Sequence, residues 1–159
     1  MTRRQTTPKQ WLILDNRIDP EHWQTLRKLP RGSGVLVLRS LDAVDNRSLR
    51  SLSRARHLTI VVETPRSARR VHSSRELTRA LLKRTPLILL SPLWPTRSHP
   101  DWRPLPRMRA ATLARLAGRR AVALGGMNAG RYAKIAALGF GGWAGISAWS
   151  RPKVIKFTE

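Results

Sequence analysis

The densest group of chemically active side chains lies in a proline-rich segment, residues 91–101, that reads SPLWPTRSHPD. Within it Thr96, Arg97, Ser98 and His99 are consecutive, so two hydroxyls, a guanidinium and an imidazole are available together. This combination suits a phosphate or pyrophosphate group, because each of these side chains can donate a hydrogen bond to phosphate oxygens. The alternative is a loop held rigid by its prolines, whose hydroxyls have no such role.

Two glycine-containing segments near the carboxyl terminus predict a second phosphate-binding feature. Gly125 and Gly126 follow an apolar run and precede Asn128, which can cap a helix. Glycines let a phosphate approach the backbone, and the N–H groups at the start of a helix point at it. Ile146 and Ser147 end the last apolar run, GWAGIS. In (β/α) barrels a phosphate commonly sits between the loops after the last two strands, so we expect the two segments to bind it together. Each segment alone is also explained by a tight turn.

These segments must be positioned by an alternation of short apolar runs and amphipathic stretches, which predicts an α/β fold with a parallel sheet and right-handed crossovers. Strands are expected at residues 11–15, 35–39, 57–63, 70–72, 87–91, 120–124 and 142–147. Helices are expected at residues 20–29, 45–54, 74–84, 107–117 and 128–138. The expected caps at the helix starts are Asp19, Asp45, Ser74 and Asn128, and Gly139 ends the last helix.

Five segments, taken together, resemble the thiamine phosphate synthase family and its thiazole tautomerase relatives. Residues 91–99 are similar to the family's SPVFPT loop, residues 123–128 to its ALGGI segment and residues 142–149 to its GA-x-G ending. Residues 71–76 and 11–15 resemble its S-x-H and YLITD segments. The resemblance covers about half of the chain and implies a shortened TIM-type (β/α) barrel with about seven strands.

In that family a pyrimidine methyl pyrophosphate is joined to thiazole phosphate in thiamine biosynthesis, and pyrophosphate is released. The resemblance therefore implies a transferase that takes phosphorylated small molecules and uses Mg²⁺ to bind pyrophosphate. Such a reaction needs stabilisation of the leaving group more than it needs an acid or a base. The matching positions supply the site residues that the resemblance implies. The catalytic candidates are Arg39, Thr96, Ser98 and His99; the phosphate-binding candidates are Gly125, Gly126, Ile146 and Ser147; the substrate-binding candidates are Arg97 and His72.

Several positions depart from the family. Arg39 is the one residue kept from a Q-x-R-x-K motif, and Glu63-Thr64 stand where the family has Asn-Asp. His99 replaces the lysine that closes the loop, and Arg70 replaces a serine on the fifth strand. The metal ligands are therefore unknown; the carboxylates that remain as candidates, each also explained as a helix cap or an arginine partner, are Asp15, Asp42, Glu63 and Asp101. These departures favour an alternative, a relative that binds thiamine-type phosphates or tautomerises thiazole phosphate without the transferase reaction.

The chain is shorter than a full barrel, since 159 residues fall below the ~200 that eight β/α units need. The shortfall lies between Glu63 and Arg70, too short a span for a parallel crossover of about a dozen residues. We expect a barrel that is cut down, rearranged or completed by a second copy in a homo-oligomer. The expected organisation is a disordered basic arm (1–10), a barrel domain (11–149) and a basic tail (150–159).

Composition adds a third interpretation. The chain has 31 Lys and Arg against 9 Asp and Glu, a formal charge of +22, and such a surface attracts polyanions. A basic nucleic-acid-binding protein on a decayed barrel is therefore an alternative; an arginine-biased genome or phosphorylated substrates would also explain the charge. Of the arginines, Arg39, Arg69 and Arg97 are expected to point toward the barrel mouth. The chain has no cysteine and no apolar run near the ~20 residues that span a bilayer, so we expect a cytoplasmic protein without a membrane partner.

Overall fold

Seven parallel strands form one sheet in the computed structural model, which describes residues 7–15, 17–96, 99–146 and 148–149. The strands are β1 (Gln10–Leu14), β2 (Gly34–Val37), β3 (Thr59–Val62), β4 (Ala68–Val71), β5 (Leu87–Leu90), β6 (Ala121–Ala123) and β7 (Gly142–Gly145). Their order is β3-β2-β1-β7-β6-β5-β4, and every neighbouring pair is parallel. Each strand begins and ends within two residues of the predicted range. The prediction of a shortened TIM-type barrel is confirmed as a curled half-barrel.

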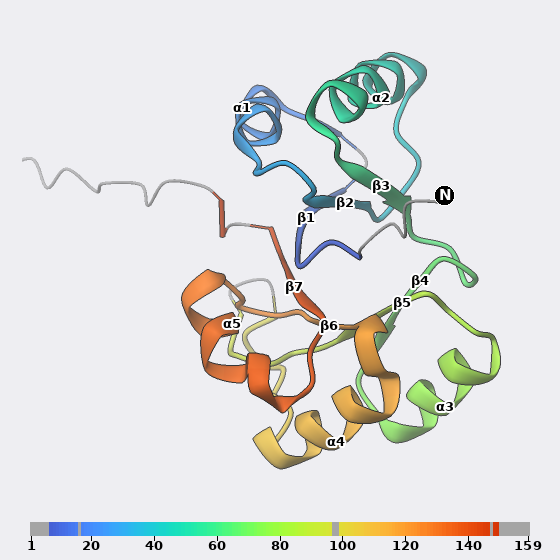
Figure 1. Cartoon of the computed structure of the whole chain (residues 1–159), viewed down its shortest axis with the longest axis vertical. Helices are drawn as coiled ribbons and strands as arrows, with labels where there is room; N and C mark the ends of the chain where they lie inside the picture. Colours follow the sequence, from blue (N-terminus) through green and yellow to red (C-terminus); the bar gives the residue numbers. More distant parts are fainter. Residues whose placement is uncertain (1–6, 16, 97–98, 147, 150–159) are drawn as a thin grey trace, which may run out of the picture.

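Helices cover the outside of this half-barrel. They are α1 (Pro20–Lys28), α2 (Ala43–Arg56), α3 (Ser74–Leu82), α4 (Arg107–Ala117) and α5 (Ala129–Ile135), with short 3₁₀ turns at η1 (Gly118–Arg120) and η2 (Ala136–Leu138). In Figure 1, α1 and α2 lie beyond one side of the strands, and α3, α4 and α5 lie beyond the other. None of the helices in the described part of the chain has the length and apolar character needed to cross a bilayer.

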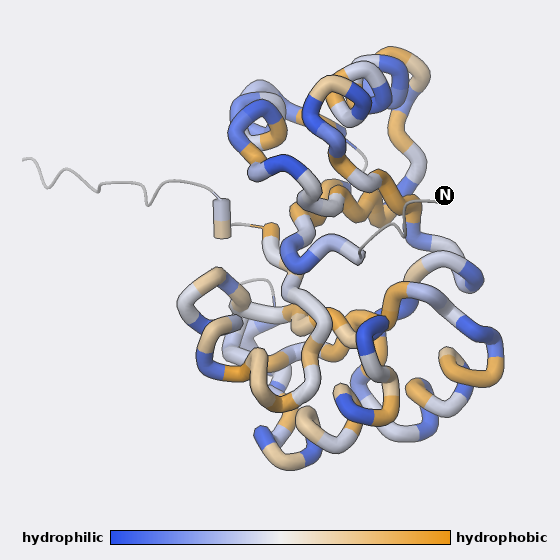
Figure 2. The backbone as a smooth tube through the Cα atoms, in the orientation of Figure 1, coloured by the Kyte–Doolittle hydropathy of each residue, from blue (hydrophilic) through white to orange (hydrophobic). Residues whose placement is uncertain are grey.

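Five of the seven strands are apolar and buried on both faces, as a sheet covered by helices requires, whereas the edge strands β3 and β4 are partly exposed. Alternate residues such as Trp11, Ile13 and Leu89 belong to the cluster inside the curl. Their neighbours, such as Leu12 and Leu14, pack outward against α1 and α2. Figure 2 shows the consequence, an apolar centre with polar residues spread over the helices. The continuous apolar runs in the sequence therefore reflect burial on two sides.

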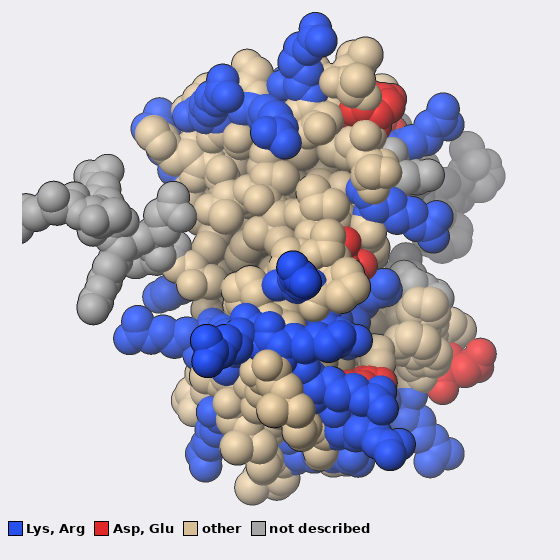
Figure 3. Space-filling view, turned by 90° about the vertical axis from the view of Figure 1, so that its right-hand side faces the viewer, with Lys and Arg blue, Asp and Glu red and all other residues tan. Residues whose placement is uncertain are grey.

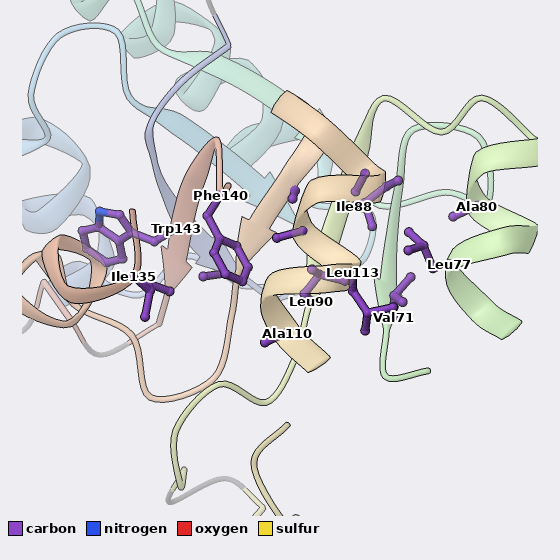
Figure 4. Close-up of a cluster of buried hydrophobic side chains, with 14 of the residues drawn as sticks. Val71, Leu77, Ala80, Ile88, Leu90, Ala110, Leu113, Ile135, Phe140 and Trp143 are labelled. Atoms are coloured by element: carbon purple, nitrogen blue, oxygen red, sulfur yellow. The ribbon is translucent and has the colours of Figure 1, made fainter. Parts of the chain in front are cut away.

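The larger outer cluster joins α4 to the second half of the sheet. Ala110 and Leu113 of α4 pack with Val71, Ile88 and Leu90 of β4 and β5, and all five side chains are buried (Figure 4). The small alanines on α4 let the helix approach the strands closely, so the leucine reaches into the strand surface. Burial of apolar surface contributes about 25 cal/mol per Å² to the free energy of unfolding. This cluster therefore stabilises the second half of the chain.

Two helix caps differ from the prediction by a few residues. The α2 cap is Asp42, whose carboxylate accepts from the Asp45 N–H at 2.7 Å. Asp45 instead accepts a hydrogen bond from the Ile18 N–H at 3.2 Å, and this long-range partner explains why it is not the cap. The α3 cap is Ser73 rather than Ser74. The predicted caps Asp19 and Asn128 are confirmed.

The half-barrel is open between β3 and β4, which are the two edge strands and do not pair with each other. Only residues 63–67 connect them. The link is closed by the Ser67 hydroxyl, which donates to the Val62 carbonyl, and by an ion pair between Arg70 and Glu63. The short span thus joins the two edges of the sheet instead of forming a crossover between paired strands.

The predicted basic arm and tail lie largely outside the described residues, which begin at Thr7 and end at Trp149. Where the arm is described, it is tied to the sheet. The Trp11 indole donates to the Pro8 carbonyl at 2.9 Å, and the Lys9 carbonyl accepts from the Trp143 N–H at 2.8 Å. The chain is therefore held in place at least one residue before β1 begins.

Candidate functional site

The carboxyl ends of the parallel strands meet at one end of the half-barrel, which we call the mouth. Several side chains singled out from the sequence follow directly on a strand. Asp15 follows β1, Glu63 follows β3, His72 follows β4, Ser91 follows β5 and Ile146 follows β7. Parallel pairing therefore gathers at one place residues that are up to 131 positions apart in the chain.

The glycine turn after β6 is shaped by the proline-rich loop after β5. Gly125 and Gly126 have φ values of +94° and +60°, a region that glycine enters without cost. A Cβ on Gly125 would lie 2.8 Å from the Pro92 Cα, and one on Gly126 would lie 2.7 Å from the Pro95 carbonyl oxygen. The Gly125 carbonyl accepts from the Trp94 N–H at 3.1 Å, whereas the N–H groups of both glycines have no acceptor among the described residues. The turn thus leaves two backbone donors available.

A guanidinium is fixed beside this turn. Arg131, in the first turn of α5, donates to the Gly126 carbonyl, and its guanidinium carbon lies 5.6 Å from the centroid of the Trp94 indole. The Asn128 side chain caps α5 by accepting from the Arg131 N–H at 2.8 Å. Stacking on an aromatic face holds a guanidinium without neutralising it, so Arg131 keeps its charge at the turn.

The end of β7 lies against the same turn. A Cβ on Gly145 would lie 3.3 Å from the Met127 carbonyl oxygen and 3.0 Å from the Ala148 Cβ. Ile146, directly after β7, is half exposed. The structure therefore brings the two predicted phosphate-binding segments together, as their places in a barrel required. Ser147, the fourth predicted phosphate-binding residue, lies outside the described residues.

His72 is held at the end of β4 by contacts with two other elements. Its Nδ1 lies 2.8 Å from the Ser91 carbonyl oxygen and 3.2 Å from the Ser91 hydroxyl. Its backbone N–H donates to a carboxylate oxygen of Glu76 at 2.6 Å. The 2.8 Å contact with a carbonyl, which can only accept, requires the proton on Nδ1, so Nε2 is the ring nitrogen left for a ligand.

An aromatic stack connects His72 to the proline-rich loop. The Trp102 indole packs edge-on against His72 at 5.2 Å between centroids and lies parallel to the His99 ring at 4.3 Å. The Thr96 hydroxyl accepts from the His99 N–H at 3.1 Å, so it stabilises the loop in this state. The remaining two donors of the predicted group, residues 97–98, lie outside the described part of the chain.

On the other side of the mouth, two carboxylates form ion pairs with arginines. The Arg70 Nε lies 3.0 Å from one oxygen of Glu63 and its Nη2 lies 3.3 Å from the other, a bidentate pair. The Arg39 Nε lies 3.4 Å from Asp15, and both side chains are exposed. Two guanidiniums thus stand at this side of the mouth, each beside one carboxylate.

The residues that the structure describes do not form a Mg²⁺ site. Mg²⁺ is held by carboxylates that are free to coordinate it. Among the described residues, no three His, Cys, Asp or Glu side chains come together. Asp15 and Glu63 bond to arginines, and Asp42 caps α2. The structure therefore favours the interpretation of these three carboxylates as structural partners.

Two arginines of the mouth were not identified correctly from the sequence. Ala68 lies in the inner cluster and Val71 in the outer one, so alternation along β4 places Arg70 on the inner face and Arg69 on the outer face. The expectation that Arg69 points toward the mouth is therefore wrong. Arg131 was not predicted as a site residue. Its position three residues after the helix cap Asn128 and five after Gly126 could have indicated a cation beside the glycine turn.

Comparisons with known proteins bear on the fold. The sequence matches none of the protein-family models and none of the curated proteins with which it was compared. Its structure is similar to a thiamine phosphate pyrophosphorylase from Pyrococcus furiosus, with a TM-score of 0.72 and 18% identity over 91% of this chain and 88% of that one. It is also similar to the thiamine phosphate pyrophosphorylase from Bacteroides thetaiotaomicron, with a TM-score of 0.56 and 14% identity over 96% of this chain and 89% of that one. The chain therefore has a thiamine phosphate synthase-like fold.

Proposed function

We propose that the chain binds the phosphate of a thiamine-type monophosphate between the turn after β6 and the end of β7. The observation that carries this proposal is the meeting of three features: the glycine turn with its open N–H groups, the Arg131 guanidinium, and the end of β7 at Ile146. Backbone donors and a guanidinium together match the charge and the donor requirement of a phosphate.

The ring of such a ligand has a place in the same mouth. His72 and Trp102 present flat surfaces at the end of β4 and on the proline-rich loop, and the same loop reaches the glycine turn through Trp94. A thiazole or pyrimidine ring packs favourably against such surfaces. The similarity of the fold to two proteins named as thiamine phosphate pyrophosphorylases supports this choice of ligand.

The joining reaction itself is the second candidate function, and the arginines of the mouth favour it. In this reaction the bond between the pyrimidine methyl carbon and the pyrophosphate oxygen breaks, and pyrophosphate leaves with the electron pair. The thiazole nitrogen then forms the new bond to that carbon. Arg39 and Arg70 would stabilise the charge on the leaving group.

Calorimetry tests the proposed binding of the phosphate. Thiazole phosphate and thiamine phosphate are titrated into the purified chain, and both are expected to bind. Arg131→Gln removes a charged hydrogen-bond donor worth about 1.5–3 kcal/mol, so affinity should fall about 10- to 150-fold. Arg109→Gln, on the exposed side of α4, is the matched control and should leave affinity unchanged. Absence of heat for both ligands would reject the proposal.

Release of pyrophosphate decides between binding and joining. The chain is incubated with the pyrimidine pyrophosphate and thiazole phosphate, and free pyrophosphate is measured. Pyrophosphate released together with thiamine phosphate establishes the transferase. Binding without release leaves the phosphate-binding function alone.

A further inference from the structure

The opposite end of the half-barrel carries a concentration of positive charge that the mouth does not explain. Because the strands are parallel, the turns that lead into them gather at this end. Six exposed cations lie in these turns, and we call them the amino-terminal arc: Lys9, Arg31, Arg66, Lys83, Arg84 and Arg119. No Asp or Glu lies in any turn that leads from a helix into a strand. Among the described residues of the turns that hold the arc, the one acidic residue is Glu63, which shares a link with Arg66 and pairs with Arg70.

Strand register places neighbouring members of the arc side by side. Ala68 is level with Leu87, and Ile88 with Ala121, so the turns before β4, β5 and β6 are adjacent. The start of β7 continues the row: a Cβ on Gly141 would meet the Arg119 carbonyl, and one on Gly142 would lie 2.6 Å from the Lys9 carbonyl oxygen. The members run from the turn before β2 to the turn before β4, and with about 4.8 Å between strands these five spacings give an arc of about 24 Å.

Stabilisation of helix ends does not account for the cations of the arc. Cations near the last turn of a helix stabilise its carbonyls. Arg56 and Arg120 do this, since they donate to the carbonyls of Leu29 at 2.6 Å and Ala117 at 3.3 Å. The six side chains of the arc, in contrast, make no hydrogen bond or ion pair with any described residue.

Arg84 is a particularly informative member of the arc. Its φ is +52°, in the left-handed region where glycine is preferred after a helix. A residue with a Cβ is strained there, because the Cβ comes close to the following carbonyl oxygen. The chain therefore carries a guanidinium at a position where stability alone would favour a residue without a side chain.

We infer that the amino-terminal arc binds the phosphate backbone of a nucleic acid without reading its sequence. An extended row of guanidinium and ammonium groups matches a linear polyanion. Four of the six residues are arginines, whose guanidinium can bind a phosphate in a bidentate manner. Among the described residues of the turns at this end, the one Trp, Tyr or Phe is Phe140, which is buried, so these turns offer no exposed aromatic ring of this kind for stacking bases. Figure 3 shows Lys and Arg side chains in a band across the side of the molecule, with few acidic side chains beside it.

A lipid surface is the competing partner for this charge. Leu82 and Leu116 are exposed at the ends of α3 and α4, where they could enter an anionic bilayer. They lie at one part of the arc only, whereas the charge continues through the turns before β1 and β2. The distribution therefore favours a long polyanion over an inserted patch.

Anisotropy of a labelled single-stranded RNA of about 20 nucleotides, measured from about 50 to 200 mM salt, tests the inference. Six phosphate contacts predict a slope of log affinity against log salt of about −4. The test variant carries Lys9→Gln, Arg66→Gln, Arg84→Gln and Arg119→Gln, and its slope should be about −1.4, for two remaining contacts. The control variant loses the same charge on exposed residues nearer the mouth, with Arg17→Gln, Arg47→Gln, Arg75→Gln and Arg109→Gln, and should keep a slope near −4.

Arg84→Gly separates binding from folding. It removes the left-handed strain, so the variant should be at least as stable as the wild type, yet its salt slope should be smaller by about 0.7. Equal losses in the test and control variants would overturn the inference in favour of bulk charge. Binding to phosphatidylserine vesicles with no binding to RNA would overturn it in favour of a lipid surface. Thiamine phosphate should not compete with RNA, which keeps this result distinguishable from the proposed function.

Discussion

Replacing Gly126 with alanine tests whether the proline-rich loop and the glycine turn fit as closely as the phosphate site requires. The new Cβ would lie 2.7 Å from the Pro95 carbonyl oxygen and 3.0 Å from both the Trp94 Cβ and the Arg131 Nη1. The φ of +60° costs roughly 1–2 kcal/mol for alanine, and overpacking against the loop costs about 1–3 kcal/mol more. We therefore expect the free energy of unfolding to fall by about 2–5 kcal/mol.

Gly32→Ala is the matched control for the backbone cost. Gly32 has a φ of +80°, and no atom lies within 4 Å of its would-be Cβ, so this variant should lose only about 1–2 kcal/mol. Urea unfolding, followed by the fluorescence of the six tryptophans, gives the free energy of unfolding of each variant. An equal loss in the two variants would refute the close contact between Gly126 and the loop.

Three further predictions concern ionisation, capping and metal dependence. Burial raises the pKa of Tyr132, whose hydroxyl donates to the Phe140 carbonyl at 3.2 Å, so stability should be lost as pH rises above about 10; Tyr132→Phe should abolish this part of the pH dependence in unfolding titrations. Asp42→Ala should lower the free energy of unfolding by about 1 kcal/mol, measured in urea, because it removes the cap of α2. A chelator should leave the affinity for pyrophosphate unchanged in calorimetry, since Asp15 and Glu63 are bound to arginines; a large loss would contradict this assignment.

The order of elements could be predicted from the sequence because each strand and helix has a strong local pattern. The gap between β3 and β4 was also predictable in outline, since residues 63–67 are too few for a crossover. The cap of α2 was not predictable, because Asp42 and Asp45 both stand near the start of the helix and either side chain could cap it. Only the long-range hydrogen bond from the Ile18 N–H to Asp45 distinguishes them.

The candidate site was predictable where it depends on strand ends and unpredictable where it depends on side-chain contacts. The glycine turn and Ile146 meet because they follow adjacent parallel strands. The contact of Arg131 with Trp94, in contrast, joins residues 37 positions apart on different elements. No local pattern determines which face of a loop tryptophan a helical arginine will cover, so this contact required the folded structure.

Recognition of a phosphate at the mouth can be tested by comparing two ligands that differ only in this group. Thiazole phosphate and the same thiazole without its phosphate are titrated into the wild-type chain and into Arg131→Gln. We predict that removal of the phosphate weakens binding at least tenfold in the wild type, and that this difference shrinks in the variant. Equal affinity of the two ligands for the wild-type chain would contradict the claim.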